Sequence, residues 1–224
     1  MGGMTQEMPK PMLPVRGKPL LEHILERLAT VGIERFLLVV GYQHELIERH
    51  FQNWPGRIEF QLQAPVNGTG SAARLARTFA ANELFLLTFG DILCQPEEYL
   101  RCISILQADA ETAAVVAVKD VDDPWQGAAV YETGGRISRI VEKPTKGTST
   151  TRWNSAGFYG FRPVVFDYFD QLRPSPRNEY EITSALEMML ADKLDLRISA
   201  IEGAWRDIGR PEDLAAVNEI GVLD

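Results

Sequence analysis

The chain has 224 residues, of which 45% are hydrophobic and 24% are charged, and its formal net charge is −8 at pH 7. This length and composition are typical of a globular chain with a sizeable core. The negative charge argues against nucleic-acid partners, and no apolar run is long enough to span a bilayer, so we expect a cytoplasmic protein. Cys94 and Cys102 are expected to be reduced thiols, because no spacing of Cys or His indicates a zinc site.

The first informative residue is Lys10, which stands between Pro9 and Pro11. Three prolines in this region predict an extended, stiff backbone. A cation on such a segment can meet a phosphate group at a low cost in ordering. The alternative is a solvated loop lysine, and the residues alone leave it open.

Helices and strands then alternate. Apolar residues recur at helical spacing from Leu20 to Leu28, and Gly32 is expected to end that helix. The next expected elements are a strand at 36–40, a helix at 44–51 and a strand at 57–63. This alternation predicts an α/β fold with a Rossmann-like, mostly parallel sheet flanked by helices.

A glycine-bearing turn follows Gln63. Gly68 and Gly70 allow close approach to the backbone, and a helix is expected from there to about Ala80. The amide of Gln63 can both donate and accept hydrogen bonds, as recognition of a nucleobase requires. An ordinary connection between a strand and a helix is the alternative.

The segment Leu84–Asp91 is apolar without alternation, which predicts a central parallel strand covered on both faces. It ends in Gly90 and Asp91, at the carboxyl end of the strand, where open α/β sheets bind ligands. Asp91 is therefore a candidate metal ligand. Alternatively, it caps the next helix, whose first turn is expected near Pro96.

The second half of the chain predicts a small antiparallel portion. Its expected elements are a helix at 97–108, strands at 112–119, 128–132, 136–141, 153–161 and 194–201, and a helix at 179–191. Glu142 and Lys143 follow the hairpin of strands 128–132 and 136–141. A carboxylate beside an ammonium group suits a substrate with hydroxyls at one end and phosphate at the other, although a surface turn has the same pattern.

Asp207 is a second carboxylate that could share a divalent ion with Asp91. Two aspartates without His or Cys companions favour Mg²⁺ over zinc. Lys10 and Lys143 add positive charge, and no Ser, Cys or His is paired with a base as a nucleophile. We therefore expect direct in-line displacement at phosphorus, in which one substrate supplies the attacking group.

Taken in order, these motifs resemble those of the sugar-1-phosphate nucleotidyltransferases over nearly the whole chain. The matching segments are Pro9–Val15, Gly17–His23, Gln63 with Gly68-Thr69-Gly70, Gly90-Asp91, Glu142-Lys143-Pro144, Asn154 with Gly157, and Trp205–Gly209. Each motif is weak alone, and their order and spacing make the combination specific.

The resemblance implies a nucleotidyltransferase (GT-A-like) fold in a single domain, 1–224. Residues 1–120 would form a nucleotide-binding half and residues 121–224 a sugar-binding half. The substrates would be a nucleoside triphosphate, with uracil or thymine as the base, and a sugar-1-phosphate, and the products an NDP-sugar and pyrophosphate. The residues do not decide the oligomeric state, and the resemblance leaves a homo-oligomer open because the family is often dimeric or tetrameric.

The resemblance also implies roles for individual residues. Asp91 and Asp207 would hold Mg²⁺, and Lys10 would face the triphosphate. Gln63, Gly68 and Thr69 would hold the nucleoside. The sugar would be lined by Gly127, Glu142, Asn154 and Gly157, and Lys143 would hold its phosphate.

The N-terminus departs from the family pattern. Only Gly2-Gly3 and Met4-Thr5 precede Glu7, where the family has an apolar strand and a G-x-G-T-R-L-x-P-L-T loop. We expect that the sequence omits residues there; if it is complete, we expect weak or no turnover. The alternatives to an active enzyme are a catalytically silent homologue that binds sugar phosphate or nucleotide and, less favoured, a Mg²⁺-dependent glycosyltransferase.

Overall fold

A computed structural model describes residues 8–219, except for the side chains of Pro211 and Glu219. The departure from the family pattern at residues 1–7 lies outside the described residues. The chain divides into two compact units, each described here by itself. Unit 1 comprises the described parts of Met1–Leu62, Phe89–Leu100 and Glu202–Asp224, and unit 2 comprises Gln63–Thr88 and Arg101–Ile201. Within residues 8–219, no helix has the length and apolar character needed to cross a membrane.

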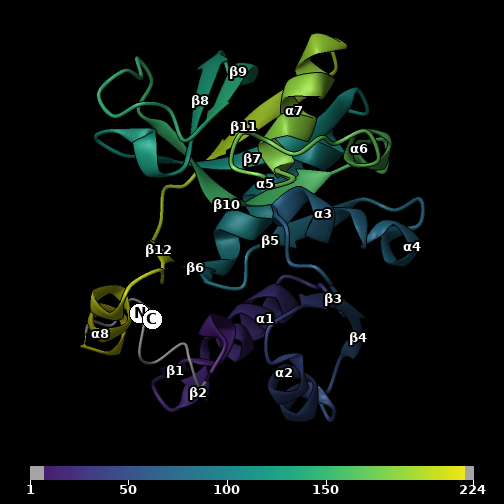
Figure 1. The fold of residues 1–224 in the computed structure, drawn as a ribbon, viewed down its shortest axis with the longest axis vertical. Helices are drawn as coiled ribbons and strands as arrows, with labels where there is room; N and C mark the ends of the chain where they lie inside the picture. The colour runs from purple at the N-terminus through teal and green to yellow at the C-terminus, as the bar shows by residue number, and fades with distance from the viewer. Residues whose placement is uncertain (1–7, 220–224) are drawn as a thin grey trace. The chain divides into compact units, whose positions relative to one another are not determined.

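Unit 1 is built from helices and short paired strands (Figure 1). In chain order its elements are η1 (Lys10–Met12), β1 (Pro14–Val15), β2 (Lys18–Pro19), α1 (Leu20–Thr30), β3 (Arg35–Val40), α2 (His44–Phe51), β4 (Arg57–Leu62), β6 (Ile92–Cys94), the start of α5 (Pro96–Ala108), β12 (Trp205–Asp207) and α8 (Pro211–Glu219). The pair β3–β4 is parallel, whereas β1–β2 and β6–β12 are antiparallel. Helix α1 buries its apolar stripe, with Leu20 and Ile24 fully covered.

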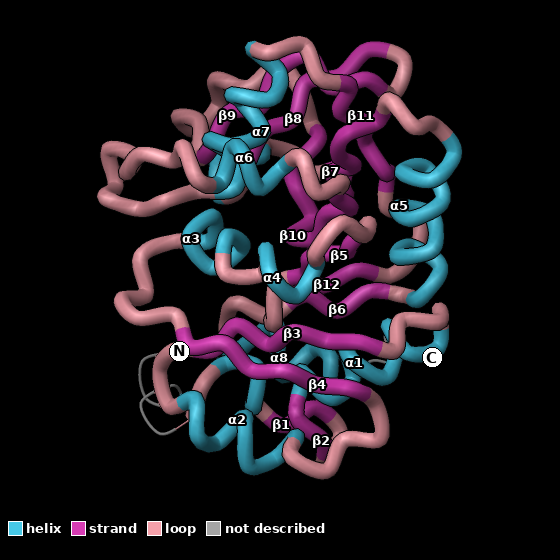
Figure 2. Tube along the Cα trace, turned by 90° about the vertical axis from the view of Figure 1, so that its right-hand side faces the viewer, coloured by secondary structure: helices cyan, strands magenta, loops and turns pink. Residues whose placement is uncertain are grey.

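Unit 2 is built on a six-stranded sheet with the order β5-β10-β7-β11-β9-β8. Its elements are α3 (Thr69–Arg74), α4 (Arg77–Ala80), β5 (Phe85–Thr88), the rest of α5, β7 (Thr112–Asp120), η2 (Pro124–Gln126), β8 (Ala128–Thr133), β9 (Arg136–Glu142), β10 (Trp153–Phe161), α6 (Val165–Phe169), α7 (Ile182–Ala191) and β11 (Asp195–Ala200). Figure 2 shows α5 on one side of the sheet and α3, α6 and α7 on the other. The apolar run of β7 is accordingly buried from Thr112 to Val118.

The α/β class is confirmed, but the expectation of a mostly parallel sheet is wrong for the described strands. Only β3–β4 and β7–β11 are parallel, and β10 pairs antiparallel with β5, β7 and β8. The antiparallel pairs arise because β10 returns from the β8–β9 hairpin to run beside β7 and β5. The antiparallel portion is therefore larger than expected, and the fold is a mixed one.

The segment Leu84–Asp91 also differs from its prediction. Strand β5 covers only Phe85–Thr88, lies at one end of the described sheet and is partly exposed along its length. A strand at the end of a sheet has less cover than a central one, which accounts for this exposure. Asp91 lies beyond β5 and directly before β6, and α5 begins only at Pro96 after that strand, so Asp91 is not a cap of α5.

The expected helix after Gly70 is broken into α3 and α4. The three-residue strands β6 and β12 were not predicted, because they are too short to show a period. The two compact units interleave along the sequence, so their bounds differ from those of the predicted halves. The halves were defined by nucleotide and sugar binding, and they stay a prediction.

Candidate functional site

Within unit 1, the ladder between β6 and β12, both labelled in Figure 1, brings Asp91 and Asp207 to neighbouring positions of the backbone. Asp207 pairs with Ile92, and the amide of Ile208 donates a 2.9 Å hydrogen bond to the carbonyl oxygen of Asp91. The two aspartates therefore occupy neighbouring positions on adjacent antiparallel segments, although they are far apart in the sequence. Backbone hydrogen bonds fix this arrangement.

Lys10 belongs to the same unit, and its positive charge favours the ionised form of both aspartates. Its segment forms the 3₁₀ turn η1, with Pro9 and Leu13 extended on either side, so the expected extended backbone is wrong for Lys10–Met12. Pro11 approaches Gly90 so closely that a Cβ on Gly90 would lie 3.0 Å from the Cγ of Pro11. A side chain at Gly90 would therefore require Pro11 to shift by a few tenths of an ångström where the lysine segment meets the aspartate segment.

The electrostatics of this group favour binding of a cation. Desolvation raises the pKa of Asp91, and the charge of Lys10 opposes that shift. Desolvation raises the pKa of Asp207 as well, and the negative charges of Asp91 and Asp213 raise it further, against Lys10 and Arg210. Two carboxylates that repel each other are stabilised by a shared divalent cation.

The two carboxylates of Asp91 and Asp207 are too few to hold a metal ion by protein ligands alone, but they suit Mg²⁺, which keeps waters and substrate phosphates as further ligands. Among the described residues, no group of three or more His, Cys, Asp or Glu side chains could hold a metal ion. A pair of carboxylates is the set with which proteins hold Mg²⁺ when waters and substrate phosphates complete the octahedron. The residues present are therefore compatible with a magnesium ion that binds together with a phosphate substrate.

In unit 2, the turn from Gln63 to Ser71 is held by side-chain hydrogen bonds. The Nε2 group of Gln63 donates to the carbonyl oxygen of Gly68 at 2.9 Å and to Oγ of Ser71 at 2.6 Å. The Ser71 hydroxyl lies 2.5 Å from Oδ1 of Asn67 and 2.9 Å from the Gly68 carbonyl oxygen. The predicted nucleoside residues Gln63 and Gly68 thus form one ordered loop.

The same turn packs on the start of α7. A Cβ on Gly68, whose φ is +124°, would lie 2.3 Å from the carbonyl oxygen of Tyr180. That oxygen accepts a 2.8 Å hydrogen bond from the Gly70 amide, and the amide of Ile182 donates to Oγ1 of Thr69 at 3.3 Å. Tyr180, which lies just before α7, and Ile182, the first residue of that helix, therefore position the predicted nucleoside turn.

The predicted sugar residues Gly127, Lys143 and Asn154 also meet within unit 2. The amide of Lys143, at a φ of +40°, donates a 2.7 Å hydrogen bond to the carbonyl oxygen of Gly127. A Cβ on Gly127 would lie 2.3 Å from Oδ1 of Asn154. That oxygen is buried and accepts no hydrogen bond from the described residues, whereas Nδ2 donates to the Ser155 carbonyl oxygen. A buried acceptor without a donor is what a ligand hydroxyl would satisfy.

Glu142 has partners that sequence reasoning missed. One carboxylate oxygen lies 3.2 Å from the guanidinium of Arg177, and the other accepts a 2.9 Å hydrogen bond from Oγ1 of Thr183. Arg177 also pairs with Glu181 at 2.8 Å and with Glu179 at 3.7 Å. Thr183 is on α7, so this helix holds both the nucleoside turn and the predicted sugar carboxylate. The only signal in the sequence was the run of opposite charges around Arg177.

Negative charge is concentrated around Glu142. The pKa of Glu187 is raised by burial and by the charges of Glu142 and Glu181. Burial raises the pKa of Tyr159 to about 12, against a hydrogen bond from Ser155 and with a contribution from Glu142. Arg177 pairs directly with several of these carboxylates, and the charge of Arg139 opposes the rise in the pKa of Glu187 as well.

Gly157 occupies a different kind of position from the other predicted sugar residues. It is buried inside β10, with φ +79°, where the pairing of β10 with β7 shifts register between Ser155 and Tyr159. A residue with positive φ at a β-bulge favours glycine for backbone reasons alone. Its contact with a sugar stays a prediction.

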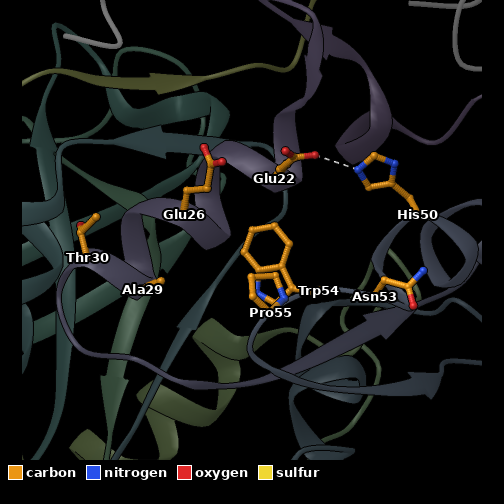
Figure 3. Close-up of a pocket in the computed structure, with 8 residues that line it drawn as sticks. All are labelled: Glu22, Glu26, Ala29, Thr30, His50, Asn53, Trp54 and Pro55. Carbon is orange, nitrogen blue, oxygen red and sulfur yellow. Dashed lines mark hydrogen bonds and ion pairs between the residues drawn. The ribbon is translucent and has the colours of Figure 1, made fainter.

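A groove of about 700 Å³ lies elsewhere in unit 1. Figure 3 shows its lining, which comprises Glu22, Glu26, Ala29, Thr30, His50, Asn53, Trp54 and Pro55. His50 is 2.8 Å from Glu22, and Lys18 pairs with both Glu22 and Glu26. This groove contains none of the predicted site residues.

The chain matches the family model described as nucleotidyl transferase over residues 2–221. It is 35% identical to the bifunctional protein GlmU of Methanococcus maripaludis over 219 residues, which are 96% of this chain and 50% of that protein. The chain thus spans about half the length of several curated relatives that it matches. It is also 32% identical to the UTP–glucose-1-phosphate uridylyltransferase AglF of Haloferax volcanii, over 94% of this chain and 86% of that protein.

Solved structures share the fold. A UDP-glucose pyrophosphorylase complexed with UDP-glucose superposes with a TM-score of 0.84 at 22% identity, covering 96% of this chain and 91% of that one. A structure described as that of a glucose-1-phosphate thymidylyltransferase from Bacillus anthracis gives a TM-score of 0.83 at 24% identity, covering 97% and 88%. The predicted nucleotidyltransferase fold is therefore confirmed.

Proposed function

The chain belongs to the nucleotidyl transferase family, among the sugar-1-phosphate nucleotidyltransferases, and from this premise we propose that it transfers a nucleotidyl group from a nucleoside triphosphate to a sugar-1-phosphate. A phosphate oxygen of the sugar-1-phosphate forms a bond to the α-phosphorus. The bond from that phosphorus to the oxygen bridging the α- and β-phosphates breaks in line. The products are an NDP-sugar and pyrophosphate.

The observation that carries this proposal is the convergence of Asp91, Asp207 and Lys10 in unit 1. Asp91 and Asp207 are joined by the β6–β12 ladder, and the charge of Lys10 acts on both carboxylates. Two partly desolvated carboxylates repel each other, so this group lowers the stability of the fold when no cation is bound. It suits a site at which a metal ion and phosphates neutralise that charge.

The residues have distinct tasks in this proposal. Asp91 and Asp207 would hold Mg²⁺, which would supply positive charge to the phosphates of the nucleotide. Lys10 adds a second cation for the triphosphate. Because no protein group attacks phosphorus, the contribution of the chain is positioning and charge neutralisation.

The second set of tasks falls to unit 2. Gln63, Gly68 and Thr69 hold the nucleoside on the turn that packs against Tyr180 and Ile182. Glu142 accepts hydrogen bonds from sugar hydroxyls, since a carboxylate offers only acceptors. Asn154 offers its buried Oδ1 to another hydroxyl, and Lys143 pairs with the sugar phosphate.

The proposed base is uracil or thymine and the proposed sugar phosphate is a hexose-1-phosphate. The relative AglF, which the chain matches over most of both lengths, is named for UTP and glucose-1-phosphate, and this supports both choices. We test them with a matrix of ATP, GTP, CTP, UTP and dTTP against hexose-, hexosamine- and heptose-1-phosphates, scored by pyrophosphate released.

The proposal expects pyrophosphate release that requires both substrates and Mg²⁺. UTP or dTTP with a hexose-1-phosphate should give the largest signal. Binding of either substrate without any pyrophosphate release would instead identify a catalytically silent homologue. Release of pyrophosphate without a sugar phosphate would contradict the proposed acceptor.

A further inference from the structure

The orientation of the Gln63 side-chain amide is fixed by groups inside its own turn. The carbonyl oxygen of Gly68 can only accept a hydrogen bond, so the amide group 2.9 Å from it must be the Nε2 donor. Nε2 also donates to Ser71 Oγ at 2.6 Å. The opposite atom, Oε1, takes no part in these hydrogen bonds and is an acceptor.

Ser71 is the second acceptor of the Gln63 Nε2 group and adds to the hold of the Gly68 carbonyl oxygen. Its hydroxyl has a single proton, and both Asn67 Oδ1 at 2.5 Å and the Gly68 carbonyl oxygen at 2.9 Å can accept it. With its proton directed to either acceptor, the hydroxyl oxygen can only accept from Gln63. Ser71 is only 9% exposed, so its hydroxyl is sheltered from competing water.

We propose that Ser71, oriented by Asn67, is a positioning residue that sets base selectivity by locking the Gln63 amide with Oε1 directed away from the turn. This inference rests on the proposed function, in which Gln63 contacts the base. An acceptor at that point forms a hydrogen bond with the N3–H of uracil or thymine. Cytosine has a lone pair at N3, which an acceptor repels, whereas a rotated amide with Nε2 outward would suit it.

The test compares UTP with CTP as substrates of the full chain at fixed glucose-1-phosphate and Mg²⁺. We expect Ser71→Ala to lower the ratio of kcat/KM for UTP to that for CTP by about tenfold, because only the Gly68 carbonyl oxygen then holds Nε2 and the rotated amide becomes easier to reach. Asn67→Ala should lower the ratio in the same direction by a smaller factor. A loss of folding would lower both values of kcat/KM and leave the ratio unchanged.

Two conservative variants and a control complete the design. Ser71→Thr keeps the hydroxyl and Asn67→Asp keeps the acceptor, so both should hold the ratio within about threefold of the unsubstituted chain. Ser104→Ala removes an exposed serine hydroxyl from α5 and should leave the ratio unchanged. The relative affinity for UMP and CMP, measured by calorimetry, gives the same comparison without turnover.

The outcomes separate the two proposals. An unchanged ratio and unchanged UMP-to-CMP affinity in Ser71→Ala, with UTP still used, would overturn the role of Ser71 and leave the proposed function standing. No pyrophosphate from any nucleotide and no nucleotide binding by the unsubstituted chain would defeat the proposed function itself.

Discussion

The amide of Ile208 donates a hydrogen bond of 2.9 Å to the carbonyl oxygen of Asp91, which extends the β6–β12 ladder by one residue beyond Asp207. The backbone therefore fixes the relative positions of the two aspartate residues. Under the proposed function, we expect this backbone arrangement to lower the ordering needed when a metal ion binds.

The first prediction concerns this aspartate pair. Asp91→Asn and Asp207→Asn should each lower Mg²⁺-dependent pyrophosphate release at least about 100-fold, because each removes a charged ligand from a two-carboxylate site. Mg²⁺ with nucleotide should raise the melting temperature of the unsubstituted chain and have little effect on either variant. Asp167→Asn, at an exposed aspartate that pairs with Arg77, is the control. Full activity in Asp207→Asn would show that the pair does not hold the ion.

The second prediction concerns Arg177. Arg177→Ala leaves Glu142 beside Glu181 without their shared cation, and Thr183 alone then orients Glu142. We expect the KM for the sugar-1-phosphate to rise about tenfold with a smaller change in kcat, because the added negative charge disfavours an anionic substrate.

The control for this prediction is Arg173→Ala, at an exposed arginine on the same loop. Arg177→Lys should recover part of the lost affinity, since it restores charge but not the forked geometry. If Arg173→Ala and Arg177→Ala raise KM equally, the effect is one of general charge and the positioning of Glu142 is not involved.

The third prediction concerns the approach of Asn154 to Gly127. Gly127→Ala places a Cβ 2.3 Å from Oδ1 of Asn154, so the amide must move from its buried position. Activity should fall about 10-fold to 100-fold, while the far-ultraviolet circular dichroism spectrum, which reports secondary structure, should stay unchanged. The double variant with Asn154→Ala has room for the new methyl group. It should be no less active than Asn154→Ala alone, and additive losses would contradict the steric explanation.

Helices and strands with a long residue period were predictable from the sequence. Strands of three residues and the direction of strand pairing were not. The helix ending near Gly32 and the buried strand at 112–119 follow from residue periodicity. The convergence of Asp91 with Asp207 was expected from their residue type and place in the motifs. The three-residue strands that join them have no period to detect, and the parallel sheet was overestimated because an apolar run does not reveal its partner's direction.

Arg177 shows why part of the candidate site escaped prediction. It lies on a loop, and its partner Glu142 is 35 residues away along the chain. No spacing rule connects a loop arginine with a carboxylate at the end of a strand. The hydroxyl of Ser71 was missed for a related reason, because a serine in the first turn of a helix is ordinary until its hydrogen-bond partners are known.

The fourth prediction concerns the pH dependence of stability through Asp195, a mostly buried carboxylate of β11. Although desolvation opposes the shift, hydrogen bonds from Arg197 and Thr112 and the charges of Arg197 and Arg136 lower its pKa below the ordinary value. Its stabilising contribution is therefore complete above the unfolded-state pKa of about 3.9 and is lost as the pH falls below that value.

Asp195→Asn should thus destabilise the chain by about 1–3 kcal/mol at pH 7, and the difference from the unsubstituted chain should shrink below about pH 4. Urea unfolding across this pH range measures both effects. Asp170→Asn, at an exposed aspartate, is the matched control. A difference that stayed constant down to pH 2 would mean that Asp195 acts through packing and not through its charge.

The fifth prediction separates backbone strain from steric contact at two glycines. Gly32 has φ +87°, and a Cβ added there would have no neighbouring atom within 4 Å, whereas Gly68 has φ +124° and would place its Cβ 2.3 Å from the Tyr180 carbonyl oxygen. Gly32→Ala should therefore cost about 1 kcal/mol from φ alone. Gly68→Ala carries that strain and a backbone clash, so we expect about 3 kcal/mol or more.

Urea unfolding gives the two costs, and amide hydrogen exchange locates them. The amide of Gly70 is hydrogen-bonded to the Tyr180 carbonyl oxygen at 2.8 Å, so Gly68→Ala should speed its exchange, whereas Gly32→Ala should not. Nucleotide affinity should fall in Gly68→Ala alone, because only that substitution pushes the nucleoside turn away from α7. Equal costs at the two glycines, with Gly70 still protected, would mean that the turn can move without loss and that α7 does not position it.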